Sequence, residues 1–163
     1  MTAHPPPSRR SAAEQRRLDA ALSELFERLI TFNQTLGLRV LSLGPGGPRL
    51  RFEMRPELVG HYQHGRLHGG VISATLDAMA GLAMMVALGE KHAEESAEHV
   101  MHRFARLGTI DLRVDYLRPG LGRHFVASAE VLRLGGRVGT AQMRLVNDED
   151  KLIATGSAAY MLS

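Results

Sequence analysis

The segment 71–88 constrains the fold most, because it is a long apolar stretch that carries one charged side chain. It reads VISATLDAMAGLAMMVAL, without lysine, arginine or glutamate, and Asp77 is its only charged residue. An apolar stretch of about five helical turns is typical of a helix that is buried on all sides. Burying a carboxylate costs free energy unless it is hydrogen-bonded, so Asp77 needs polar partners or a chemical role as a base.

A membrane-spanning helix is the alternative interpretation of this segment, because its length is close to that of a bilayer span. An aspartate at the centre of such a helix costs about 2.5 to 3.5 kcal/mol on the insertion scale. The rest of the chain alternates between apolar and polar residues, as strands of soluble proteins do. We therefore expect a helix buried inside the protein and no membrane partner.

The apolar segment is preceded by His68-Gly69-Gly70. A helix N-terminus presents unpaired N–H groups and a partial positive charge, and glycine lets a ligand approach them closely. Gly70 is thus a candidate for stabilising an oxyanion. The plainer alternatives are a tight turn for the two glycines and an N-cap at a helix break for Asp77.

The first half of the chain predicts one helix and two strands. Residues 1–10 are expected to form a disordered tail, and apolar residues at helical spacing predict an amphipathic helix over residues 11–33. Residues 38–43 and 50–54 predict a hairpin around a turn rich in glycine and proline. Residues 55–67 have no period and indicate a loop, and the polar segment 89–108 is expected to be a short excursion or lid.

The last third alternates repeatedly and predicts four strands. In residues 109–116, Ile110 and Leu112 should face one side of the sheet, and Thr109 and Asp111 the other. Further strands are expected over residues 123–134, 137–146 and 152–162, continuing the first as a four-stranded meander. A six-stranded antiparallel sheet can hide an apolar helix only by curling around it, so we predict a single α+β domain over residues 11–163.

Composition excludes several classes of function. The chain of 163 residues has no cysteine, which rules out disulfides and cysteine-ligated zinc. Its net charge is +3, its basic residues are scattered, and tryptophan is absent, so nucleic acid is not an expected partner. The N-terminus lacks the apolar core of a secretory signal, which favours a cytoplasmic location. His61, His64, His68, His99 and His102 show no recognised ligand spacing, so no metal is expected.

Together these residues resemble the hotdog-fold thioesterases, and specifically the PaaI-like acyl-CoA thioesterase group. The resemblance covers about residues 36–162. It rests on His68-Gly69-Gly70 followed seven residues later by Asp77, on the strand Thr109–Tyr116 with Pro119 after it, on the turn Gly135-Gly136-Arg137, and on the closing strand that begins at Leu152. It implies a curved antiparallel sheet wrapped around a central helix, here with an extra N-terminal helix.

The resemblance also implies the chemistry. The expected reaction is hydrolysis of a thioester of coenzyme A, which is part of the substrate, so no separate cofactor is expected. Asp77 would act as general base or nucleophile, the Gly70 N–H would hold the thioester carbonyl, and His68 would orient the site. A residue at the position of Thr109 helps place the attacking water in some relatives.

One position departs from the family pattern. Many relatives carry an asparagine six residues before the histidine, where this chain has Tyr62, followed by Gln63, whose amide is a possible substitute. Further expected substrate contacts are Gly69 and Ser73 beside the reacting groups, and Arg118, Arg133 and Arg137 at strand ends, where guanidinium groups suit the phosphates of coenzyme A.

Helix geometry adds an independent expectation about assembly. Gly70 and Asp77 lie about 10 Å apart along one helix axis, too far for both to contact one thioester carbon. The site should therefore combine Gly70 of one subunit with Asp77 of another across a two-fold axis. A dimer or tetramer with shared sites follows, in agreement with the family's usual assembly.

The predicted function is hydrolysis of acyl-CoA, with medium or long aliphatic chains preferred because the helix is apolar and rich in methionine. Two alternatives stay open. One is a hotdog hydratase or dehydratase, and the other is a module that binds or senses acyl-CoA without turnover.

Overall fold

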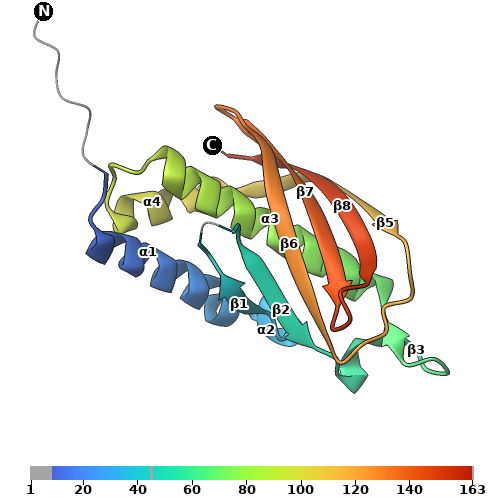
Figure 1. The fold of residues 1–163 in the computed structure, drawn as a ribbon. Coiled ribbons are helices and arrows are strands. Elements are labelled where there is room, and N and C mark those ends of the chain that lie inside the picture. Colours follow the sequence, from blue (N-terminus) through green and yellow to red (C-terminus); the bar gives the residue numbers. More distant parts are fainter. Residues whose placement is uncertain (1–8, 45, 163) are drawn as a thin grey trace, which may run out of the picture.

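The computed structural model describes residues 9–44 and 46–162, and its sheet curves around one long helix (Figure 1). The helices are α1 Ala12–Glu24, α2 Thr31–Leu36, α3 Gly69–Lys91 and α4 Ala97–Arg103, with a π-helical segment Leu25–Leu29 and 3₁₀ turns Pro56–Leu58 and Phe104–Arg106. The strands are β1 Arg39–Ser42, β2 Arg49–Glu53, β3 Val59–His61, β4 Arg66–Leu67, β5 Gly108–Tyr116, β6 His124–Leu134, β7 Val138–Asn147 and β8 Leu152–Met161. The predicted α+β class is confirmed.

The main sheet has six antiparallel strands in the order β1-β2-β6-β7-β8-β5. Strands β6, β7 and β8 form a meander, but β5 pairs with β8 rather than with β6. The predicted four-stranded meander is therefore wrong at its first strand. Residues 117–123 carry the chain from the β5 edge back to β6, and this arrangement lets Leu112 and Val114 pack against the core cluster that contains α3.

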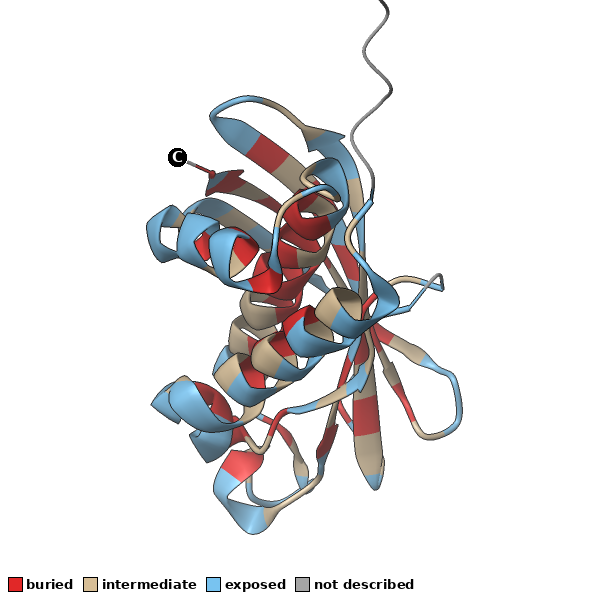
Figure 2. Cartoon of the chain, turned by 90° about the vertical axis from the view of Figure 1, so that its left-hand side faces the viewer, coloured by how far each residue is buried: buried red, intermediate tan, exposed pale blue. Residues whose placement is uncertain are grey.

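Helix α3 fills the concave side of the sheet, and among the described residues it contributes more buried core side chains than any other element (Figure 2). Glycines in the strands allow this close packing. A Cβ atom at Gly139 would lie 2.6 Å from the Met84 sulfur, and one at Gly156 would lie 3.4 Å from a Leu76 methyl group. The helix is long and apolar enough to span a bilayer, but this packing makes it the core helix of the domain.

The N-terminal region forms two helices where one was predicted. The helical path of α1 loosens into the π-helical segment and ends at Ile30, whose backbone is extended. Asn33 is buried and donates from its amide to the Phe26 carbonyl at 3.1 Å, which fixes the bend after the π-helical segment. A sequence period cannot reveal such a break, because the apolar spacing continues through it.

Helices α1 and α4 pack together beside the C-terminal half of α3 (Figure 1). Residues 1–8 of the predicted tail lie outside the described residues, but Arg10 is ordered. Its guanidinium contacts the carbonyls of Gly89, His92 and Glu95, where a cation complements the C-terminal end of α3. The polar segment 89–108 thus holds the end of α3, helix α4 and a 3₁₀ turn.

The predicted loop 55–67 contains a small hairpin, β3–β4, which projects from the N-terminal end of α3 (Figure 1). Gly60 lies against the residue that precedes α3, because a Cβ atom there would come within 2.5 Å of the His68 Cα. The His68 N–H donates to the Leu58 carbonyl at 2.9 Å, and the Leu67 N–H to the Gly120 carbonyl at 3.0 Å. These contacts fix the start of α3.

Candidate active site

His68 is the N-cap of α3. Its backbone is extended, and its Nδ1 atom accepts a hydrogen bond of 2.8 Å from the Gly70 N–H, one of the N–H groups that a helix start leaves unpaired. A Cβ atom at Gly70 would lie 2.9 Å from the same Nδ1 atom. The second glycine is therefore needed for this cap, and the N–H predicted to hold an oxyanion is engaged by His68 while the imidazole keeps this position.

Gly69 is held from the other side by the edge strand. The Tyr116 hydroxyl donates to the Gly69 carbonyl at 3.1 Å, and the tyrosine ring lies 3.4 Å from where a Cβ atom of Gly69 would be. The start of α3 is thus fixed by β5 as well as by the β3–β4 hairpin. The His68 side chain itself is exposed.

Asp77 is the centre of a hydroxyl cluster. Its Oδ1 atom accepts from the Thr109 hydroxyl at 2.9 Å and lies 2.6 Å from the Tyr160 hydroxyl, which is also 2.6 Å from the Asp77 backbone carbonyl. Within residues 9–44 and 46–162, no hydrogen-bond donor contacts the other carboxylate oxygen, Oδ2. Asp77 is half-buried, so the carboxylate is anchored through one oxygen and can meet a reactant through the other.

Thr109 reaches Asp77 because of a bulge in β5. Thr109 pairs with Tyr160 but Asp111 pairs with Ala159, so Ile110 is an extra residue in the strand. A bulge reverses the side-chain alternation and re-aims one side chain. Thr109 therefore faces α3, and Ile110 is 58% exposed. The predicted assignment of Thr109 to the polar face with Asp111, and of Ile110 to the face of Leu112, is wrong for this reason.

Tyr160 is the site residue that the sequence analysis missed. It lies in β8, is 4% exposed, and contacts α3 at Asp77 and Gly81. Burial, with the neighbouring Asp77 carboxylate, raises the pKa of Tyr160 well above its ordinary value, so the hydroxyl keeps its proton and remains a donor. The available signal was one tyrosine on the apolar face of the alanine-rich strand that closes the sheet.

The residues that we expect to contact substrate near the start of α3 lie in two separate places. Ser73 donates to the Gly70 carbonyl at 3.2 Å, within its own helix, rather than to Asp77. Tyr62 is 86% exposed in the projecting β3–β4 turn, where the Gln63 amide donates to its hydroxyl at 3.3 Å. Within one chain, these two residues are not brought to Asp77.

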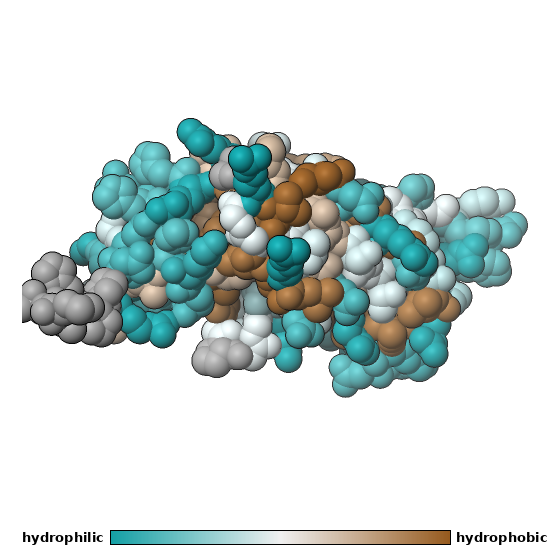
Figure 3. Space-filling model, turned by 90° about the horizontal axis from the view of Figure 1, so that it is seen from above, coloured by the Kyte–Doolittle hydropathy of each residue, from teal (hydrophilic) through white to brown (hydrophobic). Residues whose placement is uncertain are grey.

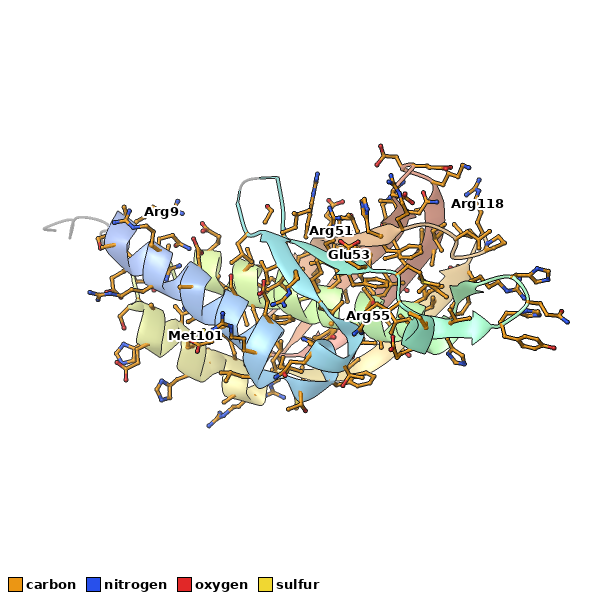
Figure 4. The ribbon with its side chains drawn as sticks, turned by 90° about the horizontal axis from the view of Figure 1, so that it is seen from below. Arg9, Arg51, Glu53, Arg55, Met101 and Arg118 are labelled. Carbon is orange, nitrogen blue, oxygen red and sulfur yellow. The ribbon has the colours of Figure 1, made fainter. Side chains whose placement is uncertain are left out.

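The three predicted phosphate-binding arginines lie at two ends of the molecule. Arg118 follows β5 beside the N-terminal end of α3 and donates to the Leu152 carbonyl at 2.9 Å. Arg9 pairs with Glu90 near the C-terminal end of α3, and Figure 4 shows Arg118 at the opposite end of the molecule from Arg9. Arg133 and Arg137 flank the Gly135 turn, beside the C-terminal end of the helix, where the Lys91 ammonium donates to the Gly135 carbonyl. About 30 Å of helix separates the two groups.

The histidines within residues 9–44 and 46–162 do not assemble as a group. The rings of His61 and His64 stack with centroids 4.6 Å apart in the β3–β4 turn. In the described part of the chain, a geometry suited to a metal is found for His92, Glu94 and Glu95, but Glu95 is bound by Arg103. An ion pair of this kind lowers the pKa of Glu95 and satisfies its charge without a metal.

Comparison with known proteins gives a consistent family assignment. A family model described as "Thioesterase superfamily" matches residues 64–154. The medium/long-chain acyl-CoA thioesterase YigI of Escherichia coli K12 is 39% identical over 141 residues, which are 86% of this chain and 91% of that protein.

Solved structures agree. A Shewanella oneidensis protein related to the thioesterase superfamily has a TM-score of 0.85 and 34% identity, covering 94% of this chain and 100% of the other. A thioesterase family protein from Silicibacter pomeroyi has a TM-score of 0.68 and 26% identity, covering 88% and 96%.

The His68 cap yields a testable prediction. His68→Ala removes the acceptor for the Gly70 N–H and should lower the free energy of unfolding by about 1 kcal/mol, whereas His68→Asn supplies another side-chain acceptor and should lower it less. Chemical denaturation of the three proteins measures this. Equal losses in both variants would contradict the capping role.

Proposed function

The chain belongs to the thioesterase superfamily, and we propose that it hydrolyses acyl-CoA thioesters with Asp77 as the reacting carboxylate. The observation that carries the proposal is the Asp77 carboxylate on helix α3, which His68 caps and which begins with Gly69 and Gly70. The Thr109 and Tyr160 hydroxyls of two strands anchor this carboxylate through Oδ1. The 39% identity to a medium/long-chain acyl-CoA thioesterase supports the substrate class. Medium or long aliphatic chains are the proposed acyl groups, and the cytoplasm is the proposed location.

The proposed reaction has two steps. Asp77 takes a proton from a water molecule, whose oxygen forms a bond to the thioester carbon and gives a tetrahedral oxyanion. The carbon–sulfur bond then breaks, and the leaving thiolate takes the proton from Asp77, yielding a carboxylic acid and coenzyme A. If Asp77 is instead the nucleophile, its oxygen bonds to the carbon, the thiolate leaves, and water hydrolyses the resulting anhydride.

The Gly70 N–H is the proposed oxyanion donor. It points out of a helix start, where the aligned peptide dipoles favour negative charge. Because it now donates to His68 Nδ1, this role requires the exposed His68 ring to turn away when substrate binds. His68 would then orient the substrate as a polar neighbour.

We also propose that two chains build each site. Gly70 and Asp77 are seven residues and about 10 Å apart on one helix face, too far for one thioester carbon. If α3 of a second subunit runs antiparallel, its Asp77 comes opposite Gly70 of the first. Arg118 of one subunit and Arg133 and Arg137 of the other then approach the same end of the substrate, where they would bind the coenzyme A phosphates.

The β5 edge is the proposed contact between subunits. It is one of the two edges of the sheet, and the other edge, β1, is partly covered because the Val40 N–H donates to Glu27 at 2.7 Å. Hydrophobic residues gather in the middle of the face seen from above (Figure 3). The exposed apolar residues on β5 are Ile110 and Tyr116, and Met161 is exposed on the neighbouring strand β8.

The reaction is tested by thiol release from a panel of short, medium, long and aromatic acyl-CoAs. Asp77→Asn keeps an oxygen that accepts from both hydroxyls but removes the base, so turnover should fall by about 10²- to 10⁴-fold with the fold intact. No release by the wild type, with acyl-CoA still bound, would instead favour a binding module. Hydration of an enoyl-CoA without thiol release would favour a hydratase.

Shared sites are tested by mixing two inactive variants. Gly70→Pro removes the N–H at the first helical turn, where the backbone tolerates proline although its ring displaces the His68 cap, and Asp77→Asn removes the carboxylate. About half of the dimers in an equal, re-equilibrated mixture contain both variants, and each has one intact site, so about a quarter of wild-type activity should return. No recovery, with mixed dimers shown by mass spectrometry, would contradict the shared site.

Phosphate binding by Arg137 is tested with two substrates that differ only in the nucleotide. Arg137→Gln should raise KM for an acyl-CoA about tenfold, equivalent to about 1.4 kcal/mol, and leave hydrolysis of the matching N-acetylcysteamine thioester unchanged. Arg144→Gln, on the exposed side of β7, is the matched control. Equal KM changes in the two variants would contradict the assignment.

A further inference from the structure

We infer that Tyr160 and Thr109 form a positioning pair that fixes Oδ1 of Asp77 and thereby makes Oδ2 the reacting oxygen. The inference rests on the proposed function, and it assigns to Tyr160 a role in turnover rather than only in packing. Neither hydroxyl needs to touch the substrate, because both act through the carboxylate.

The pair reaches one oxygen atom from two strands. Thr109 is in β5 and donates at 2.9 Å, and Tyr160 is in β8 with its hydroxyl at 2.6 Å. The two residues are direct cross-strand partners, so they approach α3 side by side. The bulge at Ile110 brings Thr109 to this face, and without it the threonine would point to the opposite face of the sheet.

Because hydrogen bonds hold Oδ1 of Asp77, Oδ2 is the carboxylate oxygen that is left to react. A carboxylate rotates readily about its last torsion, and each oxygen can accept two hydrogen bonds. Oδ1 of Asp77 has two hydroxyl contacts, whereas Oδ2 has no donor among the residues that the structure describes. The plane of the carboxylate is therefore held through Oδ1, which leaves Oδ2 to meet a reactant, and holding a reacting group in one orientation is a large part of catalysis.

Small neighbours keep the surroundings of the carboxylate open. The helical neighbours of Asp77 are Ser73, Ala74, Ala80 and Gly81, and a Cβ atom at Gly81 would be 3.6 Å from the Tyr160 ring. A methyl group at Gly81 would thus be in ordinary van der Waals contact with the Tyr160 ring. Because Tyr160 is buried and keeps its proton, it can supply a donor to Asp77 throughout the ordinary pH range.

A purely structural role makes a different prediction. The Tyr160 hydroxyl also lies 2.6 Å from the Asp77 backbone carbonyl, so its bond to the helix alone would satisfy the buried hydroxyl. In that case, removing the hydroxyl would change stability and leave the turnover of folded enzyme unaltered. The positioning role requires a loss in kcat instead.

The test separates kcat from KM in Tyr160→Phe, Thr109→Val, Thr109→Ser and the double variant Tyr160→Phe/Thr109→Val. Each single loss of a hydroxyl should lower kcat about tenfold with KM within about twofold, because the carboxylate is misplaced but the binding surface remains. Thr109→Ser should retain nearly full kcat. The double variant should deviate from the product of the single losses, since both hydroxyls hold one atom.

Two controls make the result decisive. Thr140→Val makes the same change on β7, in a residue paired with neither Thr109 nor Tyr160, and should leave kcat unchanged. Thermal unfolding confirms that each variant is folded at the assay temperature. Wild-type kcat in folded Tyr160→Phe, or equal kcat losses in Thr109→Ser and Thr109→Val, would overturn the inference. If Asp77→Asn nevertheless abolishes turnover, the proposed function stands; wild-type turnover in Asp77→Asn would refute that function itself.

Discussion

The structure depends on hiding an apolar helix that carries one carboxylate. A sheet that curls around α3 removes its apolar surface from water. The same burial would leave the Asp77 carboxylate without hydrogen-bond donors unless hydroxyl groups lay beside it. The last strand and the edge strand supply them through Tyr160 and Thr109. The pairing of β5 with β8 is therefore both the step that completes the wall around the helix and the step that builds the candidate site.

The same helix separates the two halves of the proposed chemistry. Its N-terminal end has the partial positive charge and the glycine backbone that suit an oxyanion, and Asp77 lies about two turns further on. One chain thus holds both components without bringing them together. An open β5 edge beside them gives a physical route to assembly, because pairing edge strands would align two such helices in opposite directions.

The sequence predicts the elements that have a strong period and misses those that depend on tertiary contacts. The long apolar helix, the six main strands and the glycine start of α3 follow from hydrophobic spacing and turn residues. The break at Ile30, the β3–β4 hairpin and helix α4 have no distinct period of their own.

The candidate site shows the same limit. Asp77 is conspicuous because it is the only charge in an apolar segment. Tyr160 is not, since a tyrosine in a strand is ordinary until the strand order brings it to α3. A strict period of two predicts the wrong face for Thr109, because it cannot register the bulge by which one extra residue in β5 shifts the alternation.

A crystal structure with a thioether analogue of a long-chain acyl-CoA tests the central claim most directly. The account predicts two bound analogues per dimer, each with the carbon beside sulfur between the Gly70 N–H of one subunit and Oδ2 of Asp77 of the other. Oδ1 should remain in contact with Thr109 and Tyr160. An analogue bound away from Asp77, or contacted by Gly70 and Asp77 of the same chain, would contradict it.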